Sequence, residues 1–170
     1  MRAVRKATSE PLTIKSLLSY RLHVVANLLS RSAAMHYKRE FDVSLWEWRT
    51  IALLGAESPL SLNELAKAAG LDKSQMSRVV SGLTERNLVA RSADVADGRG
   101  VQLGLTRTGV RLYEGLMRAA AERNAVFIAS LTRDERACFD GALAKLGARA
   151  RELIHVEREL AAKPRRPRSR

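Results

Sequence analysis

The apolar residues recur every three or four positions over most of the chain, which is the spacing that places side chains on one face of an α-helix. Ser44 and Thr132 each precede a glutamate by three positions, the spacing of a capping box at a helix start. The pattern therefore predicts four amphipathic helices, two before the middle of the chain and two after it. Their expected ranges are residues 11–39, 44–57, 108–130 and 132–159.

Two shorter helices are predicted between these pairs. Ser61 and Glu64 have capping-box spacing, and Gly70 ends the first short helix, because a residue without a Cβ accepts the left-handed conformation. Asp72 begins the second short helix, with Gln75 three residues later as a further capping box. Helices joined by so short a turn cross at a steep angle, so we expect a helix-turn-helix.

The hydrophobic pattern changes to a period of two after the second short helix. The run VQLGLT places Val101, Leu103 and Leu105 on one face of a strand, and the earlier run LVAR is also typical of a strand. Asp97-Gly98 lies between the two runs and favours a tight turn. We therefore expect a β-hairpin directly after the helix-turn-helix, which is the arrangement called a wing.

These elements predict a mainly α-helical fold with a small β wing. The long helices on either side of the winged helix-turn-helix lobe need more apolar cover than one chain offers, so we expect them to form the interface of a two-fold homodimer. The expected regions are a flexible basic N-terminus at 1–10, a dimerisation helix at 11–43, the DNA-binding lobe at 44–107, dimerisation helices at 108–160 and a disordered basic tail at 161–170. Within the lobe, the recognition helix is expected at about 72–86 and the wing at about 88–106.

The distribution of charge and of apolar residues narrows the function. The net charge is +12, but the last eight residues contribute five positive charges and residues 1–10 a further +2, so about +5 remains on residues 11–162. Basic tails either solubilise a chain or add sequence-independent attraction to phosphate, so DNA binding has to be argued from the ordered part. No run approaches the roughly 18 apolar residues needed to cross a bilayer, and the N-terminus lacks the features of a signal peptide. We expect a soluble, cytoplasmic protein with no membrane partner.

Catalytic chemistry is not indicated by the residue types or their spacing. The three histidines are scattered, and no metal-ligand spacing, glycine-rich phosphate loop or nucleophile motif is present. A single cysteine, Cys138, excludes an intrachain disulfide and a zinc cluster of cysteines. We therefore expect no enzyme activity, no metal and no cofactor.

The start of the second short helix is rich in side chains that bind nucleic acid. A recognition helix enters the major groove by its N-terminus, where Gln75 can pair with adenine and Arg78 can reach guanine. The role of Gln75 is contested, because a side chain used in the helix cap is not free to read a base. Arg99, between two glycines at the tip of the wing, can enter the narrow minor groove. The candidate DNA-binding residues are Lys73, Ser74, Gln75, Ser77, Arg78, Arg91, Asp97 and Arg99.

The order of these elements resembles the MarR (multiple antibiotic resistance regulator) family of winged-helix transcription regulators over roughly residues 12–156. The stretches LWEWRTIALL, LNELAKAAGLDKSQMSRVVSGLTERNLVAR and DGRGVQLGLTRTG are similar to that family's, as is Asp97-x-Arg99 followed by Leu105-Thr106-x-x-Gly109. The resemblance implies a homodimer that binds pseudo-palindromic DNA, usually as a repressor, and that is released by a small ligand or by thiol oxidation. It also implies that Asp97 braces a wing arginine, for which Arg91 and Arg99 are the candidates.

Two ways of sensing a signal are open to a protein of this kind. Cys138 lies among apolar residues of the last helix, where we expect a buried, inert thiol, which disfavours sensing by oxidation. A thiol-oxidation sensor using Cys138 is the alternative hypothesis. A small ligand is favoured, because relatives that bind aromatic acids hold the carboxylate with an arginine in the segment matching SLWEWR. Arg49 would hold the carboxylate here, unless it pairs with Glu47 or Glu57 instead. The candidate ligand-binding residues are His23, Asn27, Trp46, Trp48, Arg49 and Tyr113.

The sequence therefore predicts a dimeric, sequence-specific DNA-binding transcription regulator, most simply a repressor released by a small effector such as an aromatic carboxylate. The rival hypothesis is a non-specific architectural DNA-binding protein in which the basic tails dominate. A steep salt dependence with little preference among duplexes would indicate the architectural protein, and a large specificity ratio would indicate the regulator.

Overall fold

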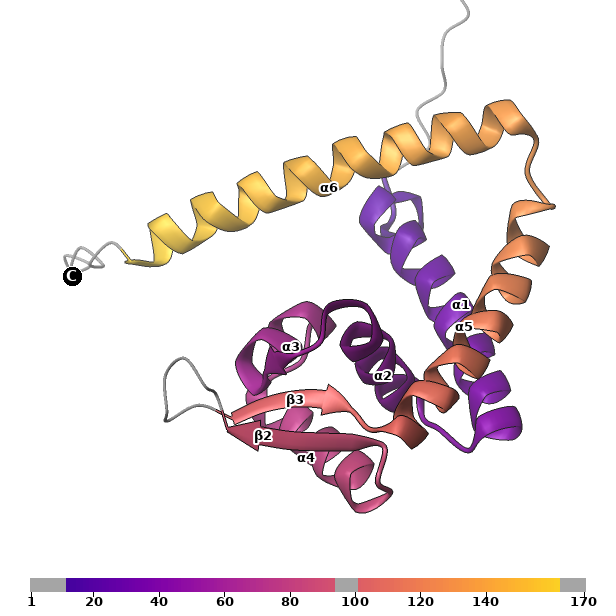
Figure 1. The fold of residues 1–170 in the computed structure, drawn as a ribbon. Helices are drawn as coiled ribbons and strands as arrows, with labels where there is room; N and C mark the ends of the chain where they lie inside the picture. Colours follow the sequence, from indigo (N-terminus) through magenta and orange to yellow (C-terminus); the bar gives the residue numbers. More distant parts are fainter. Residues whose placement is uncertain (1–11, 94–100, 163–170) are drawn as a thin grey trace, which may run out of the picture. The chain divides into compact units, whose positions relative to one another are not determined.

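The computed structural model describes residues 12–93 and 101–162, which form helices and one small antiparallel sheet (Figure 1). In chain order the elements are the 3₁₀ turn η1 (Ile14–Ser16), α1 (Leu18–Phe41), α2 (Leu45–Glu57), β1 (Leu60–Ser61), α3 (Leu62–Ala69), α4 (Lys73–Glu85), β2 (Val89–Ala93), β3 (Val101–Leu105), α5 (Arg107–Ile128) and α6 (Arg133–Ala162). The predicted fold class, mainly α with a small β wing, is confirmed. The chain divides into two compact units, residues 1–119 and 120–170, and α5 passes through the boundary. Across the described ranges, no helix combines the length and apolar character that crossing a bilayer requires.

The first helix differs from the predicted range at both ends. A short 3₁₀ turn comes first, and Leu17 is extended at ψ 133°, so the α-helix begins only at Leu18. It continues to Phe41, because Asp42 adopts the left-handed conformation at φ 52° and its backbone N–H closes the last turn by donating to the carbonyl of Lys38. The helical spacing of apolar residues does not record such a break, since Leu17 satisfies the pattern in either conformation.

The start of α2 follows the predicted capping box. The backbone N–H of Glu47 donates to the hydroxyl of Ser44 at 3.2 Å, and the Glu47 carboxylate accepts the backbone N–H of Ser44 at 2.7 Å. Two helix-start N–H groups are thereby satisfied. Thr132 and Glu135 form the same reciprocal pair before α6, at 2.8 Å and 3.3 Å.

The helix-turn-helix is formed by α3 and α4. Ser61 and Glu64 cap α3 reciprocally, and Gly70 ends it at φ 69°, as predicted. The carboxylate of Asp72 accepts the backbone N–H of Gln75 at 2.8 Å and so caps α4. The predicted capping box of Asp72 and Gln75 is only half present, because among the described residues the Gln75 side chain makes no return bond to the backbone of Asp72. The prediction of a reciprocal pair at this helix was therefore wrong, and a single carboxylate acts as the cap.

The sheet has the strand order β1-β3-β2, with both pairings antiparallel. Leu103 occupies the centre, opposite Leu60 on one side and Arg91 on the other, and is buried. Val101, which alternation places on the same face, is half exposed because it lies at the outer end of its strand. The predicted turn at Asp97-Gly98 lies outside the described residues. Strand β1, only two residues long, was not predicted.

A corner joins β3 to α5. The Thr106 hydroxyl donates to the carbonyl of Asn87 at 2.7 Å and accepts the backbone N–H of Gly109 at 3.0 Å. The backbone N–H of Thr106 donates to the carbonyl of Leu88 at 3.1 Å. Gly109 packs so closely on this carbonyl that a Cβ atom would overlap its oxygen. Glycine is required here because only a residue without a Cβ allows this close approach. A left-handed backbone conformation is not the reason, because the φ of Gly109 is not positive.

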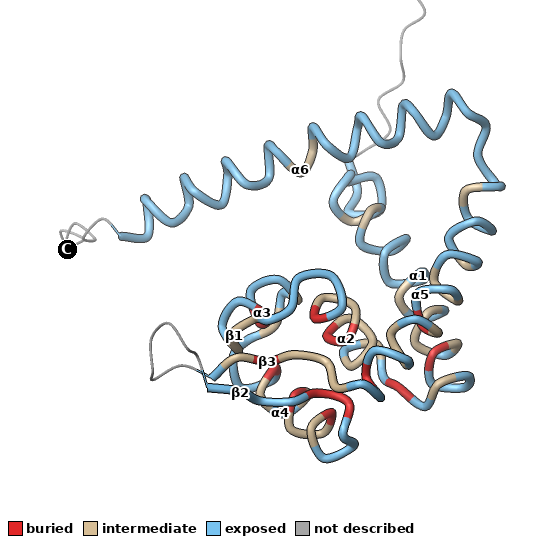
Figure 2. The backbone as a smooth tube through the Cα atoms, in the orientation of Figure 1, coloured by how far each residue is buried: buried red, intermediate tan, exposed pale blue. Residues whose placement is uncertain are grey.

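The core lies in the first unit, where α2, α3, α4 and the sheet supply most of the buried residues and α1 and α5 add Tyr37 and Leu116 (Figure 2). Its largest fully buried side chains are Ile51, Leu54, Leu65, Met76, Leu83, Leu103 and Leu116. Thr50 is the buried polar residue among the described ranges, and its hydroxyl donates to the sulfur of Met76 at 3.7 Å. The core therefore fixes α2 directly against the recognition helix. In the second unit, α6 has no buried residue.

Candidate nucleic-acid interface and effector pocket

The start of α4 presents polar side chains to solvent, as its sequence predicted. Met76, Val80 and Leu83 bury the opposite face of this helix. Because the buried side holds α4 rigidly, the exposed side can be offered to a partner in one orientation. Of the predicted residues on α4, Lys73, Ser74, Gln75 and Arg78 are exposed and Ser77 is half-buried.

Gln75 is free to bind a partner through its side chain. Only its backbone N–H takes part in the helix cap, where the acceptor is Asp72. Within the described part of the chain the Gln75 amide makes no hydrogen bond, so both its donor and its acceptor are available. An amide in this state has the paired groups that adenine recognition requires.

The arginines near α4 are only lightly held. The Arg78 Nε donates to the carbonyl of Ser74 at 3.5 Å, the upper limit of a hydrogen bond. Arg91 extends from β2 towards α4 and donates to the Ser81 hydroxyl at 3.4 Å. Neither guanidinium forms an ion pair with an acid of the described residues. Asp97 and Arg99 lie outside the described residues, and their bracing contact stays a prediction.

A pocket of about 390 Å³ opens beside the first turns of α2. Its walls come from α2 and from the end of α3, where small side chains leave the space open. Of the described residues that line it, Arg49 alone carries a charge. The lining residues are Trp48, Arg49, Ala52, Leu53, Ala68 and Ala69.

Arg49 has two partners, and neither is an acid. Its Nη2 donates to the Ser30 hydroxyl of α1 at 3.4 Å, and its guanidinium carbon lies 4.9 Å from the centre of the Trp46 ring. The expected alternative, a pair with Glu47 or Glu57, is not found among the described contacts. Glu47 instead pairs with Arg86 at 2.9 Å. Arg49 is thus a half-buried cation without a described acidic partner at the edge of an apolar pocket.

The predicted ligand-binding residues do not all meet at this pocket. Trp48 lines it and packs on Tyr37 of α1, with ring centres 4.9 Å apart. His23 and Asn27 are exposed and hydrogen-bond to each other at 2.8 Å, one turn apart on α1. The Tyr113 ring packs on the backbone of Gly55 and is absent from the lining. The structure therefore supports Trp48 and Arg49 as pocket residues and separates His23, Asn27 and Tyr113 from them.

The sequence interpretation missed two features of this region. Arg86, at the end of α4, donates to Glu47 and also to the carbonyl of Asp42 at 3.1 Å, which ties the recognition helix to the start of α2. A second hollow of about 260 Å³ lies between α2 and α4. A long-range pair has no signature in helical spacing. The alanines at the end of α3, by contrast, are a signal in the sequence that a pocket can form there. The second hollow is lined by Trp46, Leu71, Gln75, Arg78 and Val79.

The environment of Cys138 was predicted wrongly. We expected a buried thiol, but Cys138 is exposed. Its apolar neighbour Phe139 is itself 48% exposed, so the side chains that should enclose the thiol do not do so. Exposure removes the argument that burial makes the thiol inert.

Comparison with known proteins identifies the class to which this winged helix belongs. A family model described as the MarR family matches residues 41–100. The transcriptional regulator FarR of Neisseria gonorrhoeae is 30% identical over 100 residues, which cover 59% of this chain and 68% of FarR. The chain belongs to the MarR family. A second relative, the HTH-type transcriptional repressor NicR of Pseudomonas putida, is 28% identical over 116 residues, covering 67% of this chain and 73% of NicR.

The MarR fold extends well beyond the matched residues. The crystal structure of a MarR/EmrR family transcriptional regulator from Acinetobacter sp. ADP1 superimposes with a TM-score of 0.75 at 26% identity, over 83% of this chain and 99% of that one. The relatives are transcriptional regulators and not enzymes, which confirms the function class predicted from the sequence. This protein is a MarR-family transcriptional regulator with a DNA-binding winged helix.

Proposed function

We propose that this regulator is a homodimeric repressor that binds a pseudo-palindromic operator and is released by a small aromatic carboxylate. One observation carries the proposal: a single lobe holds an exposed, polar recognition-helix start and an apolar pocket with a half-buried arginine at its edge. The name of NicR, a transcriptional repressor, supports repression over activation. A regulator of this kind acts in the cytoplasm, where bacterial DNA is located.

The recognition helix would read bases with Gln75 and Arg78. A glutamine amide matches the donor and acceptor of adenine in the major groove, and an arginine fork matches the two acceptors of guanine. Side chains that are shorter than Gln75 and Arg78, or that lie farther from the bases, would fix the position of the helix through phosphate contacts. We assign that role to Lys73, Ser74, Ser77 and Arg91, and we keep the sequence-based assignment of Arg99 to the minor groove.

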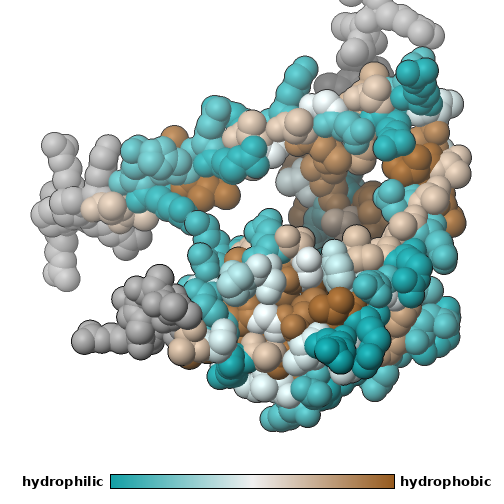
Figure 3. Space-filling view, in the orientation of Figure 1, coloured by the Kyte–Doolittle hydropathy of each residue, from teal (hydrophilic) through white to brown (hydrophobic). Residues whose placement is uncertain are grey.

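Dimerisation would cover the apolar side chains that the single chain leaves exposed. On α6, Phe139 and Ile154 are about half exposed, and α1 exposes Leu28 at 64%. Apolar surface of this extent normally marks an interface, and Figure 3 shows such side chains at the surface of α6. A two-fold dimer would place two recognition helices on half-sites about one helical turn, roughly 34 Å, apart. Light scattering at micromolar concentration should report twice the chain mass.

The effector would place its carboxylate on Arg49 and its ring on Trp48. A guanidinium binds a carboxylate through two parallel hydrogen bonds, and these are strong because both groups are charged. A volume of about 390 Å³ falls at the lower end of the range for small-molecule sites, which suits a single substituted ring. The bond from Arg49 to Ser30 is long at 3.4 Å, so an incoming carboxylate would replace a weak partner.

DNA binding is tested on duplexes selected from a random library by the protein itself. Fluorescence anisotropy should give a dissociation constant at least about 1,000-fold lower for a selected duplex than for a scrambled one. Gln75→Ala and Arg78→Ala should each lose about 5- to 150-fold on the selected duplex. Arg158→Ala removes an exposed cation of α6 and serves as the charge-matched control. Equal affinity for selected and scrambled duplexes, with a steep salt dependence, would establish the architectural protein instead.

Effector binding is tested by calorimetry with hydroxylated benzoates, cinnamates and nicotinates. Arg49→Ala should weaken binding of the best ligand by about 10- to 150-fold, because hydrogen bonds to a charged group contribute about 1.5–3 kcal/mol. Arg49→Lys should recover part of the loss, since an ammonium keeps the charge but not the fork. The uncharged amide of the same ligand is the control and should not bind. If the whole panel gives no heat and releases no DNA, the aromatic carboxylate is excluded as the effector.

A further inference from the structure

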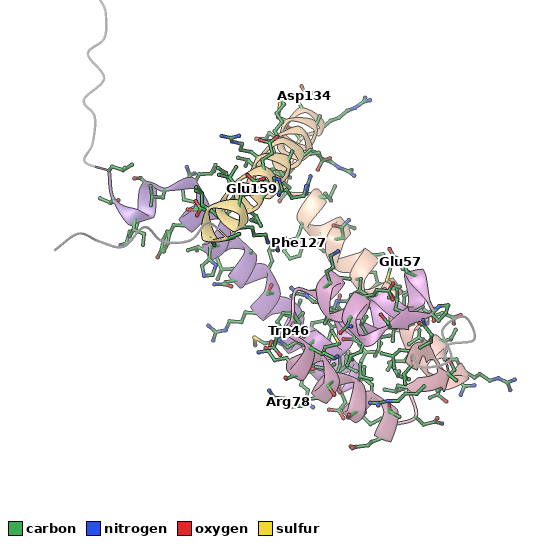
Figure 4. All side chains as sticks on the ribbon, turned by 90° about the vertical axis from the view of Figure 1, so that its left-hand side faces the viewer. Trp46, Glu57, Arg78, Phe127, Asp134 and Glu159 are labelled. Atoms are coloured by element: carbon green, nitrogen blue, oxygen red, sulfur yellow. The ribbon has the colours of Figure 1, made fainter. Side chains whose placement is uncertain are left out.

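Trp46, in the first turn of α2, touches both of the sites described above. The Arg49 guanidinium lies over its ring at 4.9 Å, and the same ring forms one wall of the hollow shared with α4. The side chain is 38% exposed, so core packing does not account for its position. Trp46 and Arg78 lie on the same side of the first unit (Figure 4). One exposed indole therefore links the pocket arginine to the recognition helix.

The hollow brings Trp46 against the flank of α4 that carries the base-reading side chains. Gln75, Arg78 and Val79 are spaced at i, i+3 and i+4, so they share one face of the helix, and all three line the hollow with Trp46. Gln75 has no described hydrogen bond through its side chain, and Arg78 has only the 3.5 Å contact with its own helix. Outside α4, the indole and Leu71 line this hollow, and the indole is the wall that α2 contributes. The indole therefore limits where the Gln75 and Arg78 side chains can point.

We propose that Trp46 is a positioning residue that holds Gln75 and Arg78 in register for base recognition, and that its stack with Arg49 transmits effector binding to them. The transmission rests on the proposed function, since it needs an anion on Arg49. The positioning does not, because it concerns DNA binding by the protein without ligand.

The coupling follows from a competition for one guanidinium. In the free protein Arg49 is shared between the Trp46 ring and a long bond to Ser30. A carboxylate offers two charge-assisted hydrogen bonds, which are stronger than a cation–π contact at a partly exposed ring, so the guanidinium turns towards the ligand. The indole then loses the contact that fixes its face, and the hollow of about 260 Å³ gives it room to move against Gln75 and Arg78.

The size of the effect is bounded by the contact that is lost. A cation–π stack at an exposed site changes an equilibrium constant by about two- to fivefold. Each protomer of a dimer would contribute once, so a ligand acting through both Trp46 residues would weaken operator binding by roughly 4- to 25-fold. This range falls within ordinary allosteric coupling, which is typically about 5- to 150-fold.

The positioning is tested without ligand by a double-mutant cycle on the selected duplex. Trp46→Leu should weaken DNA binding by about threefold or more in the otherwise unchanged protein, and by a smaller factor when Gln75 is already alanine, because only Arg78 is then left to misplace. Trp46→Leu should also reduce the preference for the correct base at the base pairs that Gln75 and Arg78 read, which Gln75→Ala and Arg78→Ala identify. It should leave the preference unchanged at every other base pair. Trp46→Phe keeps a ring and should restore most of the affinity. Additive losses, or an equal loss on selected and scrambled duplexes, would overturn the positioning role.

The transmission is tested with the benzoate that binds best in calorimetry. Trp46→Leu should still bind it, because Arg49 and the pocket remain, yet the benzoate should weaken its DNA complex at least about fourfold less than that of the wild type. An equal release of both proteins would overturn the transmission while leaving the cycle above unaffected. If no benzoate binds the wild type, the proposed effector and the transmission fail together, and the double-mutant cycle alone decides the positioning.

Discussion

Among the glycines of the described residues, Gly109 is the one where an added methyl group should cost the most stability. A Cβ there would lie 3.0 Å from the carbonyl carbon of Leu88 and would overlap its oxygen, whereas apolar carbons normally approach to about 3.5–4.0 Å. The carbonyl cannot move aside freely, because it accepts the backbone N–H of Thr106 at 3.1 Å and the Thr106 hydroxyl at 3.4 Å. Gly109→Ala must therefore displace either α5 or the turn that follows the recognition helix.

The expected loss can be worked out from these contacts. Overpacking costs about 1–3 kcal/mol, and weakening one or two hydrogen bonds to the Leu88 carbonyl adds about 1–2 kcal/mol. Alanine is favoured over glycine in a helix by about 1 kcal/mol, which offsets part of the cost. We expect Gly109→Ala to lower the free energy of unfolding by about 1–4 kcal/mol, a large share of the stability of a small domain.

Urea unfolding at one fixed protein concentration measures this difference, because a dimer's apparent stability depends on concentration. The midpoint should fall by roughly 1 M. Gly82→Ala is the matched control, because Gly82 lies in α4 and a Cβ there would meet nothing within 4 Å beyond its chain neighbours and the backbone of its own helix. This change should leave the stability unchanged or raise it by up to about 1 kcal/mol. If Gly109→Ala is as stable as Gly82→Ala, the corner is more compliant than its contacts indicate, and the reasoning fails.

Three further substitutions test the caps and the link between α2 and α4. Asp72→Ala removes the carboxylate that caps the recognition helix and should cost about 1 kcal/mol in urea unfolding, whereas Asp72→Asn should keep most of the stability; equal losses would contradict the cap. Arg86→Met breaks the ion pair with Glu47, which is partly shielded at 37% and 19% exposure, and should cost about 1 kcal/mol or less, with the cost shrinking in high salt. The pKa of Glu135 is lowered because its carboxylate accepts two hydrogen bonds from Thr132, of which the bond from the backbone N–H has the larger effect and the bond from the hydroxyl the smaller. Its contribution is therefore present above the ordinary pKa of the carboxyl and is lost as pH falls through the lowered one, so the stability gap between wild type and Glu135→Gln, measured by thermal unfolding, should close in acid. A gap that stays constant with pH would argue against this cap.

Local signals in the sequence predicted most of the secondary structure. Serine or threonine with glutamate three residues later marked three real helix starts, since both partners of a capping box lie within one turn. At α4 the same spacing gave a wrong prediction, because the Asp72 carboxylate alone caps the helix and the Gln75 side chain does not bond back to Asp72. Strand β1 depends on its pairing with β3, which is a tertiary contact. The 3₁₀ turn before α1 is held by local hydrogen bonds between Thr13 and Ser16. Hydrophobic periodicity reports neither.

The candidate pocket was only partly predictable for a related reason. Helical spacing shows which residues share a face, but not which other helix that face meets. Trp48 and Arg49 are neighbours in sequence and reach the pocket together, whereas Tyr113 packs on Gly55 and the pair of His23 and Asn27 is satisfied on α1 itself. The walls from α3 could not be assigned before the crossing of α2 and α3 was known.

The corner between β3 and α5 changes how this part of the sequence should be compared among regulators. Thr106 joins the turn after α4 to the first turn of α5 with one hydroxyl that both donates and accepts, and Gly109 allows the two segments to touch. Neither residue has to contact DNA in order to be required at its position. Proteins that share the Leu-Thr-x-x-Gly spacing would therefore inherit the same angle between wing and helix while recognising unrelated operators. The motif is a marker of architecture and carries no information about the target gene.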